Sequence, residues 1–410
     1  MAEIGRLESR TPASFRVKLY WMPSISTAGS GSDVIVVGGG LIGCAIALRL
    51  AQRKVPVRVF DRGEPGAEAS SAAAGMIAPQ GETVEPDGFF TLCAASRDLY
   101  PRFVKEVEEL AGQTVDFHRD GALLVALDEA EAKDLERIYC GQTRAGLPVE
   151  KLSGEEVRRR LPQISPQVLG GIFLAGDHWL NNELLVTALR QACRKLGVIF
   201  HTQNEVAGFE TNGGRVESIE IISGSRSAPI RYSASHFVLA AGAWSSDIAA
   251  SLNLPLPVQP CRGQMVEFDG AAGFPHIVRA GHFYCVPRAG GRLVAGSTME
   301  YAGYDKAVTA GGVLSILERA RRLAPGVTEL RFRRAWAGLR PDTPDHLPIL
   351  GYGPWGNLAF ATGHFRNGIL LAPVTAQIVT DLILQGKTSH PLKTYSPLRF
   401  QSLQPAQETG

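Results

Sequence analysis

The segment Asp33-Val-Ile-Val-Val37, followed directly by Gly38-Gly-Gly-Leu-Ile-Gly43, decides the fold expected for this chain. An unbroken apolar run rich in β-branched residues is typical of a buried strand, and the spaced glycines match the turn from such a strand into a helix. The first glycine permits a tight turn, the second lets the backbone approach a pyrophosphate, and the third allows close packing of helix on strand. The helix that begins there would direct its N–H groups and positive dipole end toward phosphates.

The residues after the glycines complete a strand, helix, strand unit. A helical pattern continues to Arg53, and a second strand from Val55 to Phe60 ends at Asp61. A carboxylate about twenty residues beyond the glycines can accept hydrogen bonds from the hydroxyl pair of a ribose. The unit therefore predicts a dinucleotide cofactor without a 2′-phosphate, and it leaves NAD and FAD open. The alternative for the glycines alone is a turn that binds nothing.

The run Ala69-Ser-Ser-Ala-Ala-Ala-Gly-Met76 consists mostly of small residues, two of which carry hydroxyl groups. This composition suits a loop whose backbone passes close to a large planar ring and a phosphate, which favours FAD over NAD. A flexible linker is the alternative interpretation of the same residues.

The rest of the chain predicts two lobes that are assembled from separated segments. Its 410 residues are enough for two lobes that each bury a core. Strands at His236–Ala241 and Leu358–Ala361 and a final helix at Gly368–Gln385 return to the nucleotide-binding sheet. Further strands and helices are predicted, most of them in an antiparallel substrate lobe: Ala122–Ala126, Leu184–Leu196, Gln264–Phe268, Phe283–Pro287, Arg292–Ser297 and Val313–Leu323.

The expected fold class is α/β with an α+β second lobe: a Rossmann-like FAD-binding domain and a substrate-binding domain with an antiparallel sheet. We assign residues 33–110, 165–255 and 335–388 to the FAD-binding domain. Residues 111–164 and 256–334 are assigned to the substrate-binding domain. The remaining residues, 1–32 and 389–410, are expected to form a disordered N-terminal extension and a C-terminal tail.

Composition excludes several classes of function. A net charge of +2, with short basic clusters at 158–160 and 331–334, gives no field for nucleic acid. The six cysteines form no C-x-x-C pair, so neither a metal site nor a disulfide framework is predicted, and a reducing cytoplasm fits best. The uncharged apolar run Val34–Leu48 is shorter than the roughly twenty residues of a membrane span. Stable membrane association is therefore not expected.

Six blocks in order resemble the D-amino-acid oxidase superfamily, and within it the glycine oxidases of thiamine biosynthesis. The resemblance covers about Asp33 to Leu384. The blocks are the glycine loop, Ser71-Ala-Ala-Ala-Gly-Met76, Leu239-Ala-Ala-Gly-Ala-Trp-Ser245, Tyr284-Cys-Val-Pro-Arg288 with Gly296-Ser-Thr-Met299, Trp336-Ala-Gly-Leu-Arg-Pro341, and Gly363-His-Phe-Arg-Asn-Gly-Ile-Leu-Leu371. The last two blocks together are the most specific.

This resemblance implies a substrate site around Arg340. Its planar guanidinium would hold the substrate carboxylate bidentately, as a lysine could not. Arg366 would be a second arginine near the substrate, and His282, Tyr284 and Met299 would line the pocket. The alternatives are a structural ion pair for Arg340, a surface position for Arg366 and core positions for the other three.

The same resemblance implies noncovalently bound FAD. Met76 would lie against the flavin, Val206 at the adenine end, and Asp61 with Arg62 at the ribose. Similar proteins usually carry glutamate at the position of Asp61, and the related sarcosine oxidases tether FAD to a cysteine that the segment 341–345 lacks. The other expected cofactor contacts are Gly38, Gly40, Leu41, Gly43, Ala69, Ser70, Ala74, Gly75, His364, Arg366, Asn367, Gly368, Ile369 and Leu370.

The implied reaction is oxidation of glycine, sarcosine or small D-amino acids by hydride transfer to the flavin, with oxygen as electron acceptor. Positioning would carry the catalysis, since the matched blocks contain no evident base. A homotetramer is common among similar proteins. Two alternatives stay open: a D-amino-acid dehydrogenase that passes electrons to a quinone, and an FAD protein without redox activity that serves as a scaffold.

Overall fold

A six-stranded sheet contains the segment that decides the fold. The computed structural model describes residues 33–222, 229–270 and 273–403, so the predicted extension (1–32) and the end of the predicted tail (404–410) lie outside the described residues. The strand order is β19-β20-β13-β1-β2-β9. The central strand β1 (Val34–Val37) pairs in parallel with β2 (Val57–Phe60) and β13 (His236–Leu239). The flanking strands are β9 (Ile199–His201), β20 (Leu358–Thr362) and the antiparallel edge strand β19 (Ile349–Tyr352).

Both faces of β1 are covered, which explains its unbroken apolar sequence. Val34 and Val36 pack in one hydrophobic cluster with the helices α1 (Leu41–Gln52), α3 (Gly88–Ala111), α6 (Asn182–Lys195) and α9 (Gly368–Gln385). Ile35 and Val37 pack in another with the three-stranded sheet of β10 (Glu205–Asn212), β11 (Arg215–Ile222) and β12 (Ile230–Ser233), and with α7 (Ser245–Ala249).

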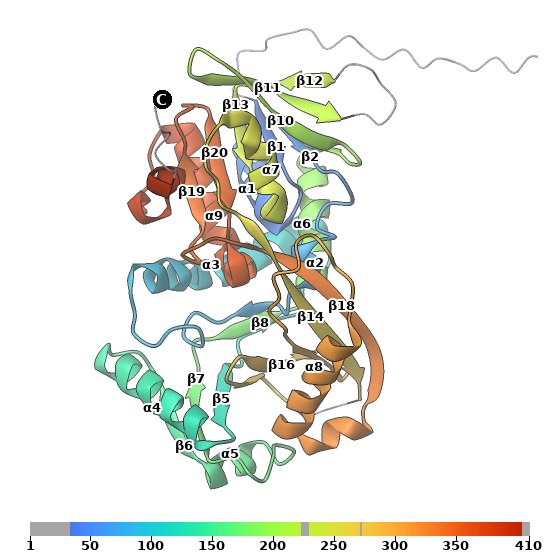
Figure 1. Ribbon diagram of the computed structural model, residues 1–410, viewed down its shortest axis with the longest axis vertical. Helices are drawn as coiled ribbons and strands as arrows, with labels where there is room; N and C mark the ends of the chain where they lie inside the picture. Colours follow the sequence, from blue (N-terminus) through green and yellow to red (C-terminus); the bar gives the residue numbers. More distant parts are fainter. Residues whose placement is uncertain (1–32, 223–228, 271–272, 404–410) are drawn as a thin grey trace, which may run out of the picture. The chain divides into compact units, whose positions relative to one another are not determined.

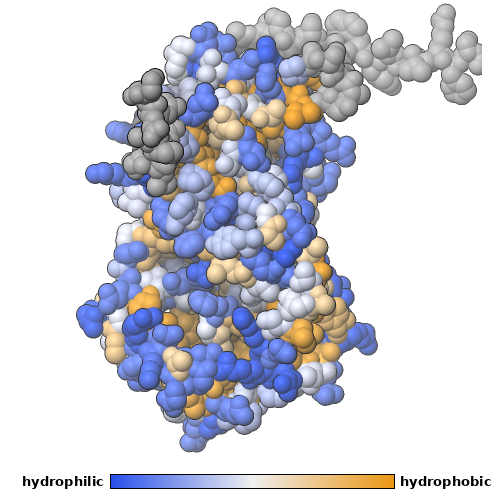
Figure 2. All heavy atoms as spheres, in the orientation of Figure 1, coloured by the Kyte–Doolittle hydropathy of each residue, from blue (hydrophilic) through white to orange (hydrophobic). Residues whose placement is uncertain are grey.

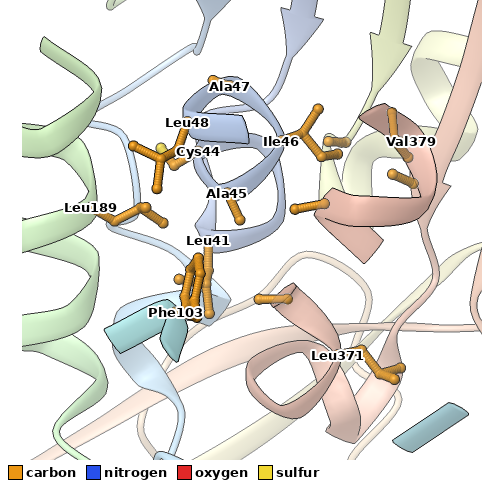
Figure 3. Packing of buried hydrophobic residues seen from close by; sticks show 14 of the residues in the cluster. Leu41, Cys44, Ala45, Ile46, Ala47, Leu48, Phe103, Leu189, Leu371 and Val379 are labelled. Carbon is orange, nitrogen blue, oxygen red and sulfur yellow. The ribbon is translucent and has the colours of Figure 1, made fainter. Parts of the chain in front are cut away.

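The first of these clusters is centred on α1. Figure 3 shows Cys44 and Leu48 of α1 on the side of Leu189 of α6, Phe103 of α3 next to Leu41, and Leu371 and Val379 of α9 on the opposite side. Fully burying a leucine of this kind contributes about 1.5–3 kcal/mol. The segment Phe365–Gln385 is long and apolar enough to cross a membrane, but 78% of its apolar window is buried within the fold. Helix α9 is therefore a core helix of this lobe.

Local signals explain where these helices begin and end. The side chain of Asn181 caps α6 by accepting a hydrogen bond from the N–H of Leu184, and Arg194 and Lys195 stand in its last turn. An asparagine cap and basic residues at the carboxyl end both favour a helix with these limits.

An eight-stranded sheet forms the second lobe (Figure 1). All neighbouring strands are antiparallel except β15 and β5, which pair in parallel. Helix α8 (Ala310–Leu323) packs on this sheet, and α4 (Glu129–Arg144) and α5 (Gly154–Arg160) flank its far strands. In order, the strands are β18 (Arg331–Asp342), β14 (Gln259–Asp269), β17 (Arg292–Gly296), β16 (Phe283–Arg288), β15 (Ile277–Ala280), β5 (Ala122–Ala126), β7 (Gly170–Leu174) and β6 (Glu150–Ser153).

Segments that connect the two large sheets along the chain form a further small sheet. It consists of β3 (Met76–Ile77), β8 (His178–Leu180) and β4 (Phe117–His118), and the short helix α2 (Ala69–Ala72) precedes it. The face of the molecule seen in Figure 2 is mostly hydrophilic, with apolar residues in small separate groups.

The predicted α/β fold with an antiparallel second sheet is confirmed. Two of the predicted domain boundaries do not coincide with the limits of the sheets. β7 falls in the range 165–255 assigned to the FAD-binding domain, yet it pairs with β5 in the eight-stranded sheet. All of β18 pairs with β14, although we placed the boundary at residue 335. Only the pairing in space defines to which sheet these strands belong. In the predicted tail, Tyr395 and Phe400 are buried.

Candidate cofactor and substrate site

One large cavity, of about 890 Å³, is lined by both lobes in the described part of the chain. Its wall includes the glycine loop, the segment from Phe60 to Met76, the end of β18 and the start of α9. Every predicted site residue lines this cavity except Gly43. Predicted site residues that lie up to about three hundred positions apart along the chain therefore meet at one cavity.

Each of the three glycines of the loop is required for a different reason. Gly38 has φ +102°, and a Cβ atom there would lie 2.4 Å from the carbonyl oxygen of Ala240. A Cβ atom on Gly43 would lie 1.9 Å from the oxygen of Gly38, which accounts for its role in packing. At Gly40 the nearest atom would be Ser70 Oγ, at 3.3 Å. The fold itself therefore does not demand glycine at residue 40, whereas close approach of a pyrophosphate would.

The carboxylate of Asp61 is fixed against the glycine loop. Its Oδ2 accepts a hydrogen bond from the N–H of Gly39 at 2.7 Å, and its Oδ1 accepts one from Gly63 at 2.8 Å. Each oxygen keeps a further lone pair for a ribose hydroxyl. The side chain of Asp61 is thus held at the cavity wall by two backbone hydrogen bonds.

Arg62 lies at the same end of the cavity. Its guanidinium is 3.6 Å from the ring centre of Trp244 and 3.1 Å from a carboxylate oxygen of Glu68. Trp244 in turn stacks on Tyr304. Val206 of β10 also lines the cavity and is buried. This end offers flat apolar and cationic surfaces, which suit an adenosine group.

The small-residue run is held in place by several elements, so the flexible-linker alternative is wrong. Asn182 donates hydrogen bonds to the carbonyl oxygens of Ser70 and Ser71, both at 2.9 Å. Arg288 donates to Ala74 O at 2.8 Å, and the indole of Trp336 donates to Ala72 O at 3.0 Å. The run therefore presents a fixed, narrow backbone surface to the cavity.

Arg340 projects from β18 with its guanidinium against the backbone of Gly263. A Cβ atom at Gly263 would lie 2.3 Å from both terminal nitrogens of Arg340, so glycine makes room for this side chain. Nη2 donates to Ser297 Oγ at 2.7 Å and Nη1 to Thr298 O at 3.2 Å. Within residues 33–222, 229–270 and 273–403, no carboxylate lies within 4.0 Å of the Arg340 guanidinium. The ion-pair alternative therefore does not apply to the described structure.

His282, Tyr284 and Met299 line the same cavity, and none of them is buried. Met299 is 61% exposed, which is unusual for a large apolar side chain. The core alternative therefore does not hold for the exposed His282 and Met299, whereas Tyr284 is half-buried and also packs against a hydrophobic cluster of the second lobe. The hydroxyl of Tyr284 lies 3.5 Å from Met265 Sδ, a weak contact that leaves it able to bond a ligand.

Arg366 lines the cavity but is paired with a carboxylate. Its Nη2 lies 2.8 Å from Oε2 of Glu82, and the other oxygen of Glu82 lies 2.7 Å from Nη1 of Arg279. Burial alone would raise the pKa of Glu82, but the two arginines hold it below its ordinary value. Glu82 and Arg279 are site residues that sequence reasoning missed, since neither belongs to a motif. The three groups together leave one net positive charge at this wall.

The segment from His364 to Leu370 enters α9 through a short 3₁₀ turn, η4 (Phe365–Asn367). The N-terminus of α9, at Gly368, lies in the cavity wall and supplies N–H groups and a positive dipole end. Burial lowers the pKa of His364 to about 3, and its Nε2 pairs with Thr375 Oγ1 at 3.1 Å. His364 is therefore a neutral residue held by the fold.

The sequence pattern described as FAD dependent oxidoreductase matches residues 33–382. The chain therefore belongs to this family of FAD-dependent oxidoreductases, and FAD is the cofactor that the cavity fits. In the described residues, no group of three or more His, Cys, Asp or Glu side chains could hold a metal ion.

Among named relatives, glycine oxidase of Geobacillus kaustophilus is 34% identical over 372 residues, which are 90% of this chain and 97% of that protein. Its crystal structure superposes with a TM-score of 0.85 over 90% of this chain and 98% of the other. The bifunctional protein ThiO/ThiG of Synechocystis sp. is 37% identical over 90% of this chain. The chain spans about half the length of that bifunctional relative, 54%.

Proposed function

We propose that this chain is an FAD-dependent oxidase of small amines, with glycine, sarcosine and small D-amino acids as its substrate class. The observation that carries the proposal is the guanidinium of Arg340, which reaches the cavity without a carboxylate partner among the described residues. The likeness to proteins named glycine oxidase supports the same reading.

A substrate carboxylate would take the position beside Arg340 that the protein leaves open. Two parallel charge-assisted hydrogen bonds from the guanidinium match the two carboxylate oxygens. The hydroxyl of Tyr284 can complete this contact. Arg279 and Arg366 outnumber Glu82 in the lining of the same cavity, so its charge also favours an anionic substrate.

Bound FAD would supply the hydride acceptor and return the electrons to oxygen as hydrogen peroxide. The protein would contribute orientation: with its carboxylate held by Arg340, the substrate directs one Cα–H bond toward the acceptor. A partly desolvated cavity favours the neutral amine, whose lone pair forms the new carbon–nitrogen double bond as the hydride leaves. The imine would then hydrolyse to glyoxylate and ammonia, or pass on to the thiazole synthesis of thiamine.

We expect FAD to be bound tightly but noncovalently, because no cysteine is among the residues that line the cavity in the described structure. Acid precipitation of the yellow protein should leave the colour in the supernatant. Colour retained in the pellet would show a covalent bond. A colourless protein that cannot be reconstituted with FAD would contradict the cofactor assignment.

The purified protein should produce hydrogen peroxide when it is supplied with glycine. A panel of glycine, sarcosine, D-alanine and simple amines, assayed for peroxide and ammonia, would give the order of preference. The matched control is the same panel under argon, where the flavin should bleach without peroxide formation. Turnover only with a quinone or an artificial dye would instead favour the D-amino-acid dehydrogenase alternative.

An FAD protein without redox activity is the alternative from a different class. Its flavin would stay oxidised under anaerobic glycine and sarcosine. The extent of bleaching therefore separates this alternative from both enzymes in one measurement. Location in the cytoplasm and assembly as a homotetramer are parts of the proposal that gel filtration and fractionation would test.

A further inference from the structure

A second group of polar residues has no part in the function proposed above: Tyr301 and His346 line the cavity, and Asp342 lies behind them. Asp342, at the end of β18, is completely buried. Its Oδ2 accepts a hydrogen bond from the hydroxyl of Tyr301 at 2.7 Å, and its Oδ1 lies 2.7 Å from Nδ1 of His346. The same Oδ1 accepts a hydrogen bond from the N–H of Thr343 at 2.9 Å. A buried carboxylate thus orients one imidazole ring.

The backbone and packing of His346 are specific as well. Its φ is +57°, a conformation that is uncommon for any residue except glycine. Its ring stacks on Phe365, with ring centres 4.8 Å apart and planes inclined by 19°. Phe365, with φ +46°, opens the segment that leads into α9. Backbone strain held at a cavity wall is a reason to search for a function of the side chain.

The hydrogen bond to Asp342 decides which nitrogen of His346 can exchange a proton. A carboxylate only accepts, so Nδ1 carries a hydrogen atom in either charge state of the ring. Nε2 is then the atom that gains or loses a proton. An imidazolium at this position would form an ion pair with the buried carboxylate of Asp342. His346 lines the cavity, so its charge acts inside it.

We propose that His346 balances charge at the oxidation site: protonated at Nε2 and oriented by Asp342, its imidazolium offsets the negative charge that hydride transfer brings to the flavin. This rests on the proposed function, in which FAD is held in the cavity that His346 lines. Transfer of a hydride adds two electrons and one proton, hence one negative charge, to the acceptor. Asp342 and Tyr301 act through His346 and are positioning residues.

Other charged and titratable groups surround this unit and enter its pH dependence. Arg340 precedes Asp342 on β18, and the buried thiol of Cys261 faces Arg340 across the β14–β18 ladder. His364 and Arg366 stand on either side of Phe365, but the first is buried and neutral and the second is paired with Glu82. The carboxylate of Asp345, in the same loop as His346, is paired with Arg399.

Sulfite titration of the holoenzyme tests the proposal without substrate turnover. Sulfite adds to oxidised flavin and leaves a negative charge on the ring, so a neighbouring cation strengthens its binding. His346→Asn removes the titrating ring while asparagine tolerates positive φ and can still donate to Asp342. The dissociation constant of sulfite, read from loss of the visible flavin band, should rise about tenfold in the variant at the acid end of the range.

The pH profile distinguishes a charge from a merely structural role. The ratio of the sulfite dissociation constant of His346→Asn to that of the wild type should fall toward one as pH rises from about 5 to 8, the range in which histidine loses its proton. His346→Lys should restore tight sulfite binding and keep it at the upper pH. His346→Gly, which suits the backbone at this position, should behave like His346→Asn and provides a second neutral variant.

A matched control exists elsewhere in the chain. His118 also pairs with a carboxylate, Asp116, at 2.7 Å and stacks on an aromatic ring, Trp179, at 4.1 Å, yet it does not line the cavity. His118→Asn should leave sulfite binding unchanged. A ratio that stays within about twofold of one at every pH for both neutral variants of His346 overturns the proposal. Loss of flavin from both would also overturn it, since His346 would then support the fold.

The outcome is independent of the amine substrate. If the wild type binds FAD but oxidises no amine in the panel, the proposed function fails while the sulfite ratios still report on His346. If amine oxidation occurs and the ratios stay flat, only the role of His346 fails.

Discussion

Arg340→Lys should weaken the apparent affinity for glycine by roughly ten- to a hundredfold, since each charge-assisted hydrogen bond contributes about 1.5–3 kcal/mol and 1.4 kcal/mol is a factor of ten. Lysine keeps the charge but loses the planar fork. It also cannot reproduce the contacts with Ser297 Oγ and Thr298 O that hold the guanidinium flat against Gly263. Steady-state kinetics with glycine, together with flavin content, would measure the effect.

A comparison of substrates separates ligand binding from structural support. An amine without a carboxylate should be almost indifferent to Arg340→Lys, because it does not use the guanidinium. Arg334→Lys is the matched control: Arg334 lies on the same strand, but it is paired with Glu267 and Glu183 outside the cavity. That variant should leave glycine kinetics unchanged. Equal losses for both substrates in Arg340→Lys, with release of flavin, would place the carboxylate site elsewhere.

Gly40→Ala should weaken FAD binding by about a hundredfold while the apoprotein keeps its melting temperature. The added methyl group meets nothing in the protein closer than Ser70 Oγ, at 3.3 Å, but it occupies the approach of the pyrophosphate to the helix N-terminus. Loss of one or two hydrogen bonds to a charged phosphate accounts for this magnitude. Fluorescence titration of the apoprotein with FAD would give the dissociation constant.

Substitutions of two other glycines provide controls for this result. Gly43→Ala forces a methyl group to within 1.9 Å of a backbone oxygen and should lower both stability and FAD affinity. Gly356→Ala meets nothing within 4 Å and should change neither. A loss of apoprotein stability in Gly40→Ala equal to that in Gly43→Ala would mean that residue 40 is glycine for the fold rather than for the cofactor.

The nucleotide-binding unit could be predicted from the sequence because its information is local. The strand, the glycines, the helix and Asp61 lie within thirty residues, and each step has a distinct periodicity or residue type. The same holds for the helices that end at Gln385 and Lys195, which have clear caps or apolar faces. Arg340 and the segment from His364 were placed by resemblance to a family, and the cavity contains both.

The groups that sequence reasoning missed depend on contacts between distant segments. Glu82 and Arg279 are 197 positions apart, and only the folded chain shows that they pair. Tyr301 and Asp342 are separated by 41 positions, and His346 resembles an ordinary loop residue in the sequence. The domain boundaries predicted at residues 165 and 335 do not match the sheets for a related reason, since pairing with β5 and β14 rather than composition assigns β7 and β18 to a sheet.

The long pairing of β14 with β18 determines the direction in which the side chain of Arg340 points. From Glu267 opposite Arg334 to Cys261 opposite Arg340, the register of the two strands is unbroken, and the one irregularity lies beyond Glu267. A single residue inserted between Arg334 and Arg340 would turn that guanidinium to the opposite face of the sheet. The spacing of residues inside these two strands therefore determines whether Arg340 faces the cavity.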